Sequence, residues 1–216
     1  MNSIFKLDGP VFTILNKFCD VLILSILWLV FCFPLITIGP ASAALYHTAH
    51  KSLLHSEGYV LSTFWKSFRA NLKQGILLTL LCVPVSAFCV VSYFFSDSLG
   101  RGSVLGAVYF AVTILVSLFL LIMLTYTFPV LSRFYMTVPQ ILMTSVALAV
   151  TRIGFTLLLI VILLLCVFAV WLAPFTGFVL PACYAMAAER LIEPAFKKAL
   201  DAREKAAQEE SASVEK

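Results

Sequence analysis

The chain has 216 residues, of which 62% are hydrophobic and 12% are charged, and its net charge is +4. Soluble domains carry about twice that share of charged residues, so a soluble fold of this size would lack the polar side chains to cover its surface. The composition excludes an ordinary cytosolic enzyme, a disordered chain and a nucleic-acid-binding module, which needs a strongly basic face. It predicts a protein embedded in a lipid bilayer.

Apolar runs long enough to cross a bilayer follow one another along the chain. A transmembrane helix needs about 20 mostly apolar residues, and strand-like alternation is absent, so the runs are predicted to be helices. The predicted fold class is all-α, a polytopic helical membrane bundle of about five transmembrane helices. Residues 1–192 form the transmembrane domain and residues 193–216 a charged cytoplasmic tail. The expected spans are residues 21–38, 76–95, 104–128, 154–173 and 176–192.

The distribution of Lys and Arg predicts the orientation of these spans. Of the 15 basic residues, all but Lys6, Lys17 and Arg101 fall between spans one and two, between spans three and four, or at and after the end of span five. Because short cytoplasmic segments are enriched in Lys and Arg, we expect the N-terminus outside and the C-terminus in the cytoplasm. Residues 41–43 (ASA) resemble a signal-peptide cleavage site. The apolar run before them is longer than the usual ~7–15 residues, so we interpret span one as an anchor.

The connection between spans one and two contains two predicted cytoplasmic helices. In residues 41–56, the positions of Ala41, Leu45, Ala49 and Leu53 lie on one line, and small residues at such spacing allow close helix packing. The second helix is amphipathic, with an aromatic side beside a basic stripe, which suits the lipid headgroup zone or a partner protein. The positive-inside rule alone already accounts for the basic stripe, and a lipid- or partner-docking role is the alternative. The candidate contact residues are Phe64, Trp65, Phe68, Lys66, Arg69 and Lys73.

The sequence predicts no catalytic, cofactor or metal site. It contains no GxSxG, HExxH or CxxC motif and no Gly-rich phosphate loop, so we expect a protein that is not an enzyme. His47, His50 and His55 spread over about 140° of a helix, with no neighbouring carboxylate or Cys in the sequence, and are expected to be exposed or interfacial. Glu189 is expected to snorkel to the interface, since no partner carboxylate supports a buried role.

Several segments of the chain, taken in their order and spacing, carry a family resemblance. They include residues 5–10 (FKLDGP), 33–39 (FPLITIG), 57–59 (EGY), 64–74 (FWKSFRANLKQ) and 128–134 (FPVLSRF). Together they resemble the YesL family, over nearly the whole chain up to the charged tail. The resemblance implies a small bacterial integral membrane protein of the cell (plasma) membrane, of unassigned activity, whose relatives often accompany carbohydrate-uptake and polysaccharide-utilisation systems.

Three functions remain open at this point. The first is a non-enzymatic accessory component of carbohydrate uptake or utilisation. The second is a small permease or transporter subunit, although the spans offer mostly Ser, Thr and Tyr where a transport path needs polar groups. The third, a membrane-embedded enzyme, lacks a catalytic motif. The expected partners are the lipid bilayer, the permease of a carbohydrate ABC transporter or a second copy of the chain, and no nucleic acid.

Overall fold

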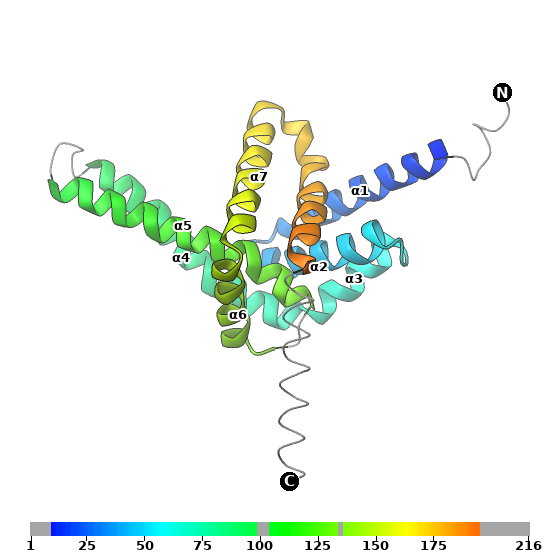
Figure 1. Cartoon of the computed structure of the whole chain (residues 1–216), viewed down its shortest axis with the longest axis horizontal. Coiled ribbons are helices and arrows are strands. Elements are labelled where there is room, and N and C mark those ends of the chain that lie inside the picture. Colours follow the sequence, from blue (N-terminus) through cyan, green and yellow to red (C-terminus); the bar gives the residue numbers. More distant parts are fainter. Residues whose placement is uncertain (1–9, 99–103, 134–135, 195–216) are drawn as a thin grey trace, which may run out of the picture.

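The computed structural model describes residues 10–98, 104–133 and 136–194, and in these ranges every regular element is helical (Figure 1). The predicted all-α class is therefore confirmed. Residues 180–194 form the last described helix. The tail from 195 lies outside the described residues. The long helices are α1 (Pro10–Cys32), α4 (Leu72–Ser98), α5 (Val104–Arg133) and α7 (Ile153–Leu172). The shorter elements are η1 (Leu35–Thr37), α2 (Ile38–Thr48), η2 (Ala49–Leu54), α3 (Val60–Ala70), α6 (Val138–Thr151) and η3 (Pro174–Phe178).

Four helices are long and apolar enough to cross a membrane, and they correspond to the first four predicted spans. Their apolar parts are Leu15–Cys32, Leu72–Phe95, Val104–Arg133 and Ile153–Leu172. The segment predicted as the fifth span begins with η3 and continues as the helix 180–194. The four long helices support a multi-pass membrane protein, and a fifth crossing stays a prediction.

The end of the first predicted span was wrong. We expected it to reach residue 38, whereas α1 ends at Cys32 and the chain turns through η1 into α2. Pro34, at the N-cap of η1, is in an extended conformation. Because proline lacks an N–H and disfavours helical backbone at the residue before it, the helix ends just ahead of this position.

The helix ends lie at two levels in Figure 1. The beginning of α1, the end of α4, the beginning of α5 and the end of α7 all lie in the upper part of the view, whereas α2, α3 and α6 lie below them. α4 packs along α5, and α7 stands beside the helix 180–194. The short helices therefore form a base from which the long helices extend.

The core of the molecule is α2, not one of the long helices. It packs against α1, α3, α4 and α5, and residues 39–46 and Thr48 are buried. The predicted close packing along Ala41, Leu45, Ala49 and Leu53 is confirmed, since each side chain is at most 4% exposed. Small side chains let the neighbouring helices approach α2 from several directions.

The tightest of these approaches joins α2 to α4 at two glycines. A Cβ on Gly75 would lie 2.6 Å from the backbone nitrogen of Pro40, and a Cβ on Gly39 would collide with the carbonyl oxygen of Gly75. The hydroxyl of Thr79 completes the contact, because it accepts a hydrogen bond from the Gly39 N–H (2.9 Å) and donates one to the Gly75 carbonyl (2.8 Å). Thr79 thus satisfies a backbone donor in the first turn of α2 that has no partner within its own helix.

The long helices expose apolar side chains on their outer faces. Examples are Phe88 (67% exposed) on α4, Leu115 (66%) on α5 and Trp171 (79%) on α7. Exposed apolar surface of this extent is costly in water, whereas lipid tails cover it without cost.

Candidate functional site

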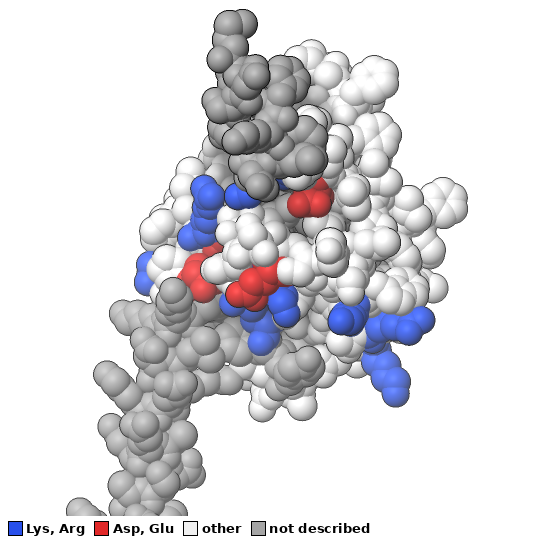
Figure 2. Space-filling model, turned by 90° about the vertical axis from the view of Figure 1, so that its right-hand side faces the viewer, with Lys and Arg blue, Asp and Glu red and all other residues white. Residues whose placement is uncertain are grey.

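Charged groups of both signs meet where η2, the end of α5 and the helix 180–194 converge. Figure 2 shows acidic and basic side chains in a band across the middle of one face, beside an uncharged area above and to the right. Four residues form ion pairs or hydrogen bonds with one another here, and we call them the ionic cluster: His50, Arg133, Glu189 and Glu193.

Arg133 is the centre of the ionic cluster. It is the last residue of α5, and its Nη2 atom lies 2.6 Å from Nδ1 of His50, 3.0 Å from Oε2 of Glu189 and 2.6 Å from Oε2 of Glu193. The two carboxylates face the same cation because residues four apart lie on one side of a helix. A guanidinium that bonds two carboxylates is a strong, charge-assisted contact.

Glu189 does not snorkel, and that prediction was wrong. Its side chain is 0% exposed, and Ala182, Ala185 and Ala188 on the same helix are equally buried. The small side chains let the helix approach the core closely, so that Glu189 is carried inside with it. The prediction also stated that no partner carboxylate supports a buried role, whereas Glu193 meets Glu189 at Arg133. Of the two Glu189 carboxylate oxygens, Oε1 is buried without a hydrogen-bond partner.

His50 joins the ionic cluster as a neutral imidazole. Its side chain is 20% exposed, and burial together with the neighbouring Arg133 charge lowers its pKa to about 4. Its Nδ1 can therefore accept a hydrogen bond from Arg133, which places the remaining ring proton on Nε2. His55 is exposed, and its ring centroid lies 4.3 Å from that of His50. Burial also lowers the pKa of His47, which is half-buried.

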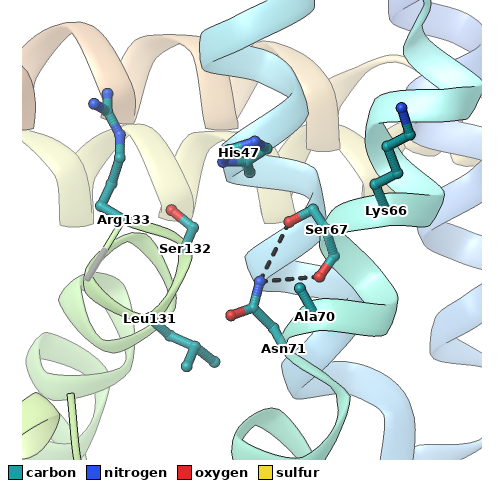
Figure 3. A pocket seen from close by; sticks show the side chains of 8 residues that line it. All are labelled: His47, Lys66, Ser67, Ala70, Asn71, Leu131, Ser132 and Arg133. Carbon is teal, nitrogen blue, oxygen red and sulfur yellow. Dashed lines mark hydrogen bonds between the residues drawn. The ribbon is translucent and has the colours of Figure 1, made fainter. Parts of the chain in front are cut away.

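A polar cavity of about 200 Å³ lies on the other side of Arg133, between α2, α3 and α5 (Figure 3). In Figure 3, His47 stands between the Arg133 side and the Ser67 side of this cavity. Asn71 donates hydrogen bonds to the carbonyl oxygen (2.9 Å) and hydroxyl (3.3 Å) of Ser67. The lining thus combines cationic side chains with hydroxyl and amide groups and suits a small polar or anionic solute. Its lining residues are His47, Lys66, Ser67, Ala70, Asn71, Leu131, Ser132 and Arg133.

The six candidate contact residues lie on α3 and, for Lys73, in the first turn of α4, and they are divided between the interior and the surface. Phe64 and Phe68 are 1% and 5% exposed, and their rings pack on Phe31 with centroids 5.6 and 4.8 Å apart, so the structure removes both from the outward-facing set. Trp65 is 40% exposed, and the guanidinium carbon of Arg69 lies over its ring, 4.7 Å from the ring centroid. The outward-facing set, which we call the α3 stripe, contains Trp65, Lys66, Arg69 and Lys73.

Sequence reasoning missed the ionic cluster because its members come from three distant segments. Arg133 and Glu189 are 56 positions apart, and Arg133 and His50 are 83 apart. The available signal was a Glu inside an apolar segment followed by a second Glu four residues later. Acidic side chains inside spans are rare unless they have a partner, so the pair predicts a cation brought from elsewhere in the fold.

Comparison with known proteins gives one match. A family described as a protein of unknown function, DUF624, matches residues 21–93. The matched region contains η2 with His50, α2, α3 and one side of the polar cavity, whereas Arg133, Glu189 and Glu193 lie outside it. No curated protein and no solved structure matches the chain.

Proposed function

We propose that the protein is a non-enzymatic accessory component of carbohydrate uptake in the bacterial plasma membrane, with the N-terminus outside and the C-terminus in the cytoplasm. The apolar outer faces of the long helices and the one-sided distribution of Lys and Arg support the placement. The resemblance to the YesL family is the basis for the link to carbohydrate systems. The absence of a catalytic motif from the sequence is consistent with a non-enzymatic role.

The observation that carries this proposal is that α3 buries two of its aromatic side chains and leaves its basic side chains exposed. Phe64 and Phe68 fix α3 to the core, so the α3 stripe is held rigidly on the surface. A partly exposed Trp beside three exposed cations is the composition of a protein docking surface, because Trp and Arg are enriched in interfaces. We expect the stripe to contact an acidic cytoplasmic surface of a transporter permease.

Purification of the tagged protein in mild detergent tests the docking role. The transporter should co-purify with the wild type and be lost from the variant Lys66→Glu/Arg69→Glu/Lys73→Glu. Lys51→Glu is the matched control, since Lys51 is an exposed cation outside the stripe. Binding to anionic lipid vesicles is measured on the same proteins. If the triple variant loses vesicle binding and no transporter is recovered from any sample, the stripe binds lipid, and the accessory role is contradicted.

A reporter fused at Glu57 tests the orientation. Glu57 is exposed in the connection between η2 and α3, so a reporter fused there is accessible to solvent. A fluorescent reporter that folds only in the cytoplasm should be active at this position. Activity of an alkaline phosphatase fusion instead would place α3 and its stripe outside the cell and contradict the proposed docking.

The second candidate is a small permease, and the buried ionic cluster favours it. Ionisable side chains buried at the end of spanning helices mark transport and proton pathways in many membrane proteins. Sugar uptake into liposomes that contain only this protein would support the permease and overturn the accessory role. That uptake should then fall in Glu189→Gln and persist in Lys51→Glu. Liposomes without uptake would exclude the permease.

A further inference from the structure

We propose that His50, Glu189 and Glu193 form a binding site for a divalent transition-metal ion, which enters in exchange for the guanidinium of Arg133. The site goes beyond the accessory or permease role and depends on neither.

The first argument is the geometry of the three side chains. One ligand atom from each of His50, Glu189 and Glu193 can be chosen so that all three lie within 4.8 Å of one another. They come from η2 and from successive turns of the helix 180–194, two elements that already pack in the core. One imidazole nitrogen and two carboxylates are ligands that Zn²⁺, Mn²⁺ and Fe²⁺ accept.

The second argument is that Arg133 cannot satisfy all the groups that surround its guanidinium. Its Nη2 atom carries two hydrogens, yet three acceptors surround that atom at 2.6, 3.0 and 2.6 Å. Among the described residues, this one guanidinium faces two carboxyl groups, and that of Glu189 is fully buried. Burial disfavours the ionised form of such a group, whereas a divalent ion in the same position would balance both carboxylates.

The third argument is the unused oxygen of Glu189. Its side chain is 0% exposed, and Oε1 is buried without a hydrogen-bond partner. A buried carboxylate oxygen that lacks a partner destabilises the fold, and more so when it is charged. A metal ion bound through both oxygens of Glu189 would remove that cost, which a single contact with Arg133 leaves in place.

The surroundings provide an entrance for the ion and a place for the displaced side chain. His50 and Glu193 are 20% and 26% exposed, so an ion can reach the cluster from the aqueous side. Arg133 also lines the adjacent polar cavity of about 200 Å³, where Ser132 and Asn71 offer oxygen atoms to a guanidinium. The cavity therefore offers the displaced guanidinium a polar environment next to its present position.

Zn²⁺ binding to the purified full-length protein in detergent tests the site. We expect one Zn²⁺ per chain by elemental analysis after dialysis, with affinity at least tenfold lower in His50→Asn and in Glu193→Gln, since loss of a ligand or its support costs about 10–100-fold. His55→Asn is the matched control, because His55 lies beside His50 and outside the ligand set. Its affinity should equal that of the wild type.

Arg133→Gln separates a metal site from a purely structural ion pair. Removal of the competing cation should raise the Zn²⁺ affinity at least tenfold, or, where the variant is unstable, added Zn²⁺ should restore its melting temperature. A structural ion pair predicts loss of stability that Zn²⁺ does not restore. Loss of stability that Zn²⁺ does not restore would therefore overturn the proposal. Two further results would also overturn it: wild-type protein that binds no Zn²⁺, and equal Zn²⁺ affinity in the wild type and in His50→Asn.

Discussion

In a soluble protein the most apolar helix is usually the most buried one, and the helices α2 and α7 show the opposite. α7 is the most apolar of the candidate spans, yet only Thr156, Leu159 and Ile160 of its 20 residues are buried. α2 is a short helix of mainly Ala, Gly, Ser and Thr with a few larger residues, and nine of its 11 residues are buried. In a bilayer, apolar side chains gain little from leaving the lipid, whereas small side chains gain close contact between helices.

The difference between α2 and α7 shows that hydropathy and residue size predict different surroundings for a helix. A long apolar run identifies a helix that faces lipid, as Leu164 and Trp171 of α7 do. A run of small residues identifies the helix around which the others pack. The comparison predicts that small changes in volume at α2 cost more than larger changes on the outer face of α7.

Gly75→Ala should produce the largest effect. The added Cβ would lie 2.6–2.8 Å from N, Cδ and Cα of Pro40, atoms that no rotamer change can move, so α4 must shift away from α2. We expect a loss of about 3 kcal/mol, the upper end of the range for overpacked sites. SDS titration in mixed micelles, followed by circular dichroism, measures it. Gly154→Ala is the control, because nothing lies within 4 Å of a Cβ there. Equal stability of the two variants would refute the role of α2 as the packing centre.

Leu159→Ala tests the one buried patch of α7. Leu159 is 0% exposed, and truncation of a buried Leu costs about 2–5 kcal/mol, so we expect about 2 kcal/mol for a helix that packs on one side only. Leu164→Ala removes the same atoms from a side chain that is 57% exposed and should change stability by less than about 0.5 kcal/mol. The same titration compares the two. A large effect at Leu164 would mean that the outer face of α7 contacts protein.

The sequence predicts much of the fold because its signals are local. The four long helices follow from uninterrupted apolar runs, and the packing along Ala41, Leu45 and Ala49 follows from small residues at helical spacing. The misplaced end of the first span also had a local cause, since Pro34 lies inside the run that we expected to be helical. The rule for residues before proline does not by itself locate the break, because Pro84 and Pro129 lie inside α4 and α5 without ending them.

The candidate site was predicted less well because its geometry depends on contacts between distant segments. Nothing near Glu189 in the sequence identifies Arg133 as its partner, so the expectation of an interfacial carboxylate was reasonable and wrong. The amphipathic pattern of α3 shows that its aromatic and basic sides differ. It does not show that the ring of Phe31 of α1 contacts Phe64, Phe68 and Trp65, or that the first two are buried whereas Trp65 stays 40% exposed.

Thr79→Val separates the hydrogen bonds at the α2–α4 contact from its shape. Valine preserves the volume of threonine but leaves the Gly39 N–H and the Gly75 carbonyl without the hydroxyl that each bonds. An unpaired buried donor costs about 1–3 kcal/mol, and we expect about 1.5 kcal/mol. In the control Thr151→Val, an exposed hydroxyl bonded to Ala147 is lost, and stability should change little. If both variants unfold at the same SDS fraction, shape alone holds the contact.

The smallest effect is expected where α2 meets α1. The indole N–H of Trp28 donates to the hydroxyl of Ser42 at 3.2 Å, and Ser42→Ala removes only that acceptor from a helix in which alanine fits well. The loss should be about 0.5–1 kcal/mol. A double-mutant cycle with Trp28→Phe isolates the hydrogen bond, because the second substitution should then cost less by the same amount. Ser86→Ala, where the hydroxyl bonds only the carbonyl of Cys82 in its own helix, should show no coupling to Trp28. Zero coupling for Ser42 would mean that α1 is held against α2 by packing alone, which would extend the small-residue argument to the whole of α2.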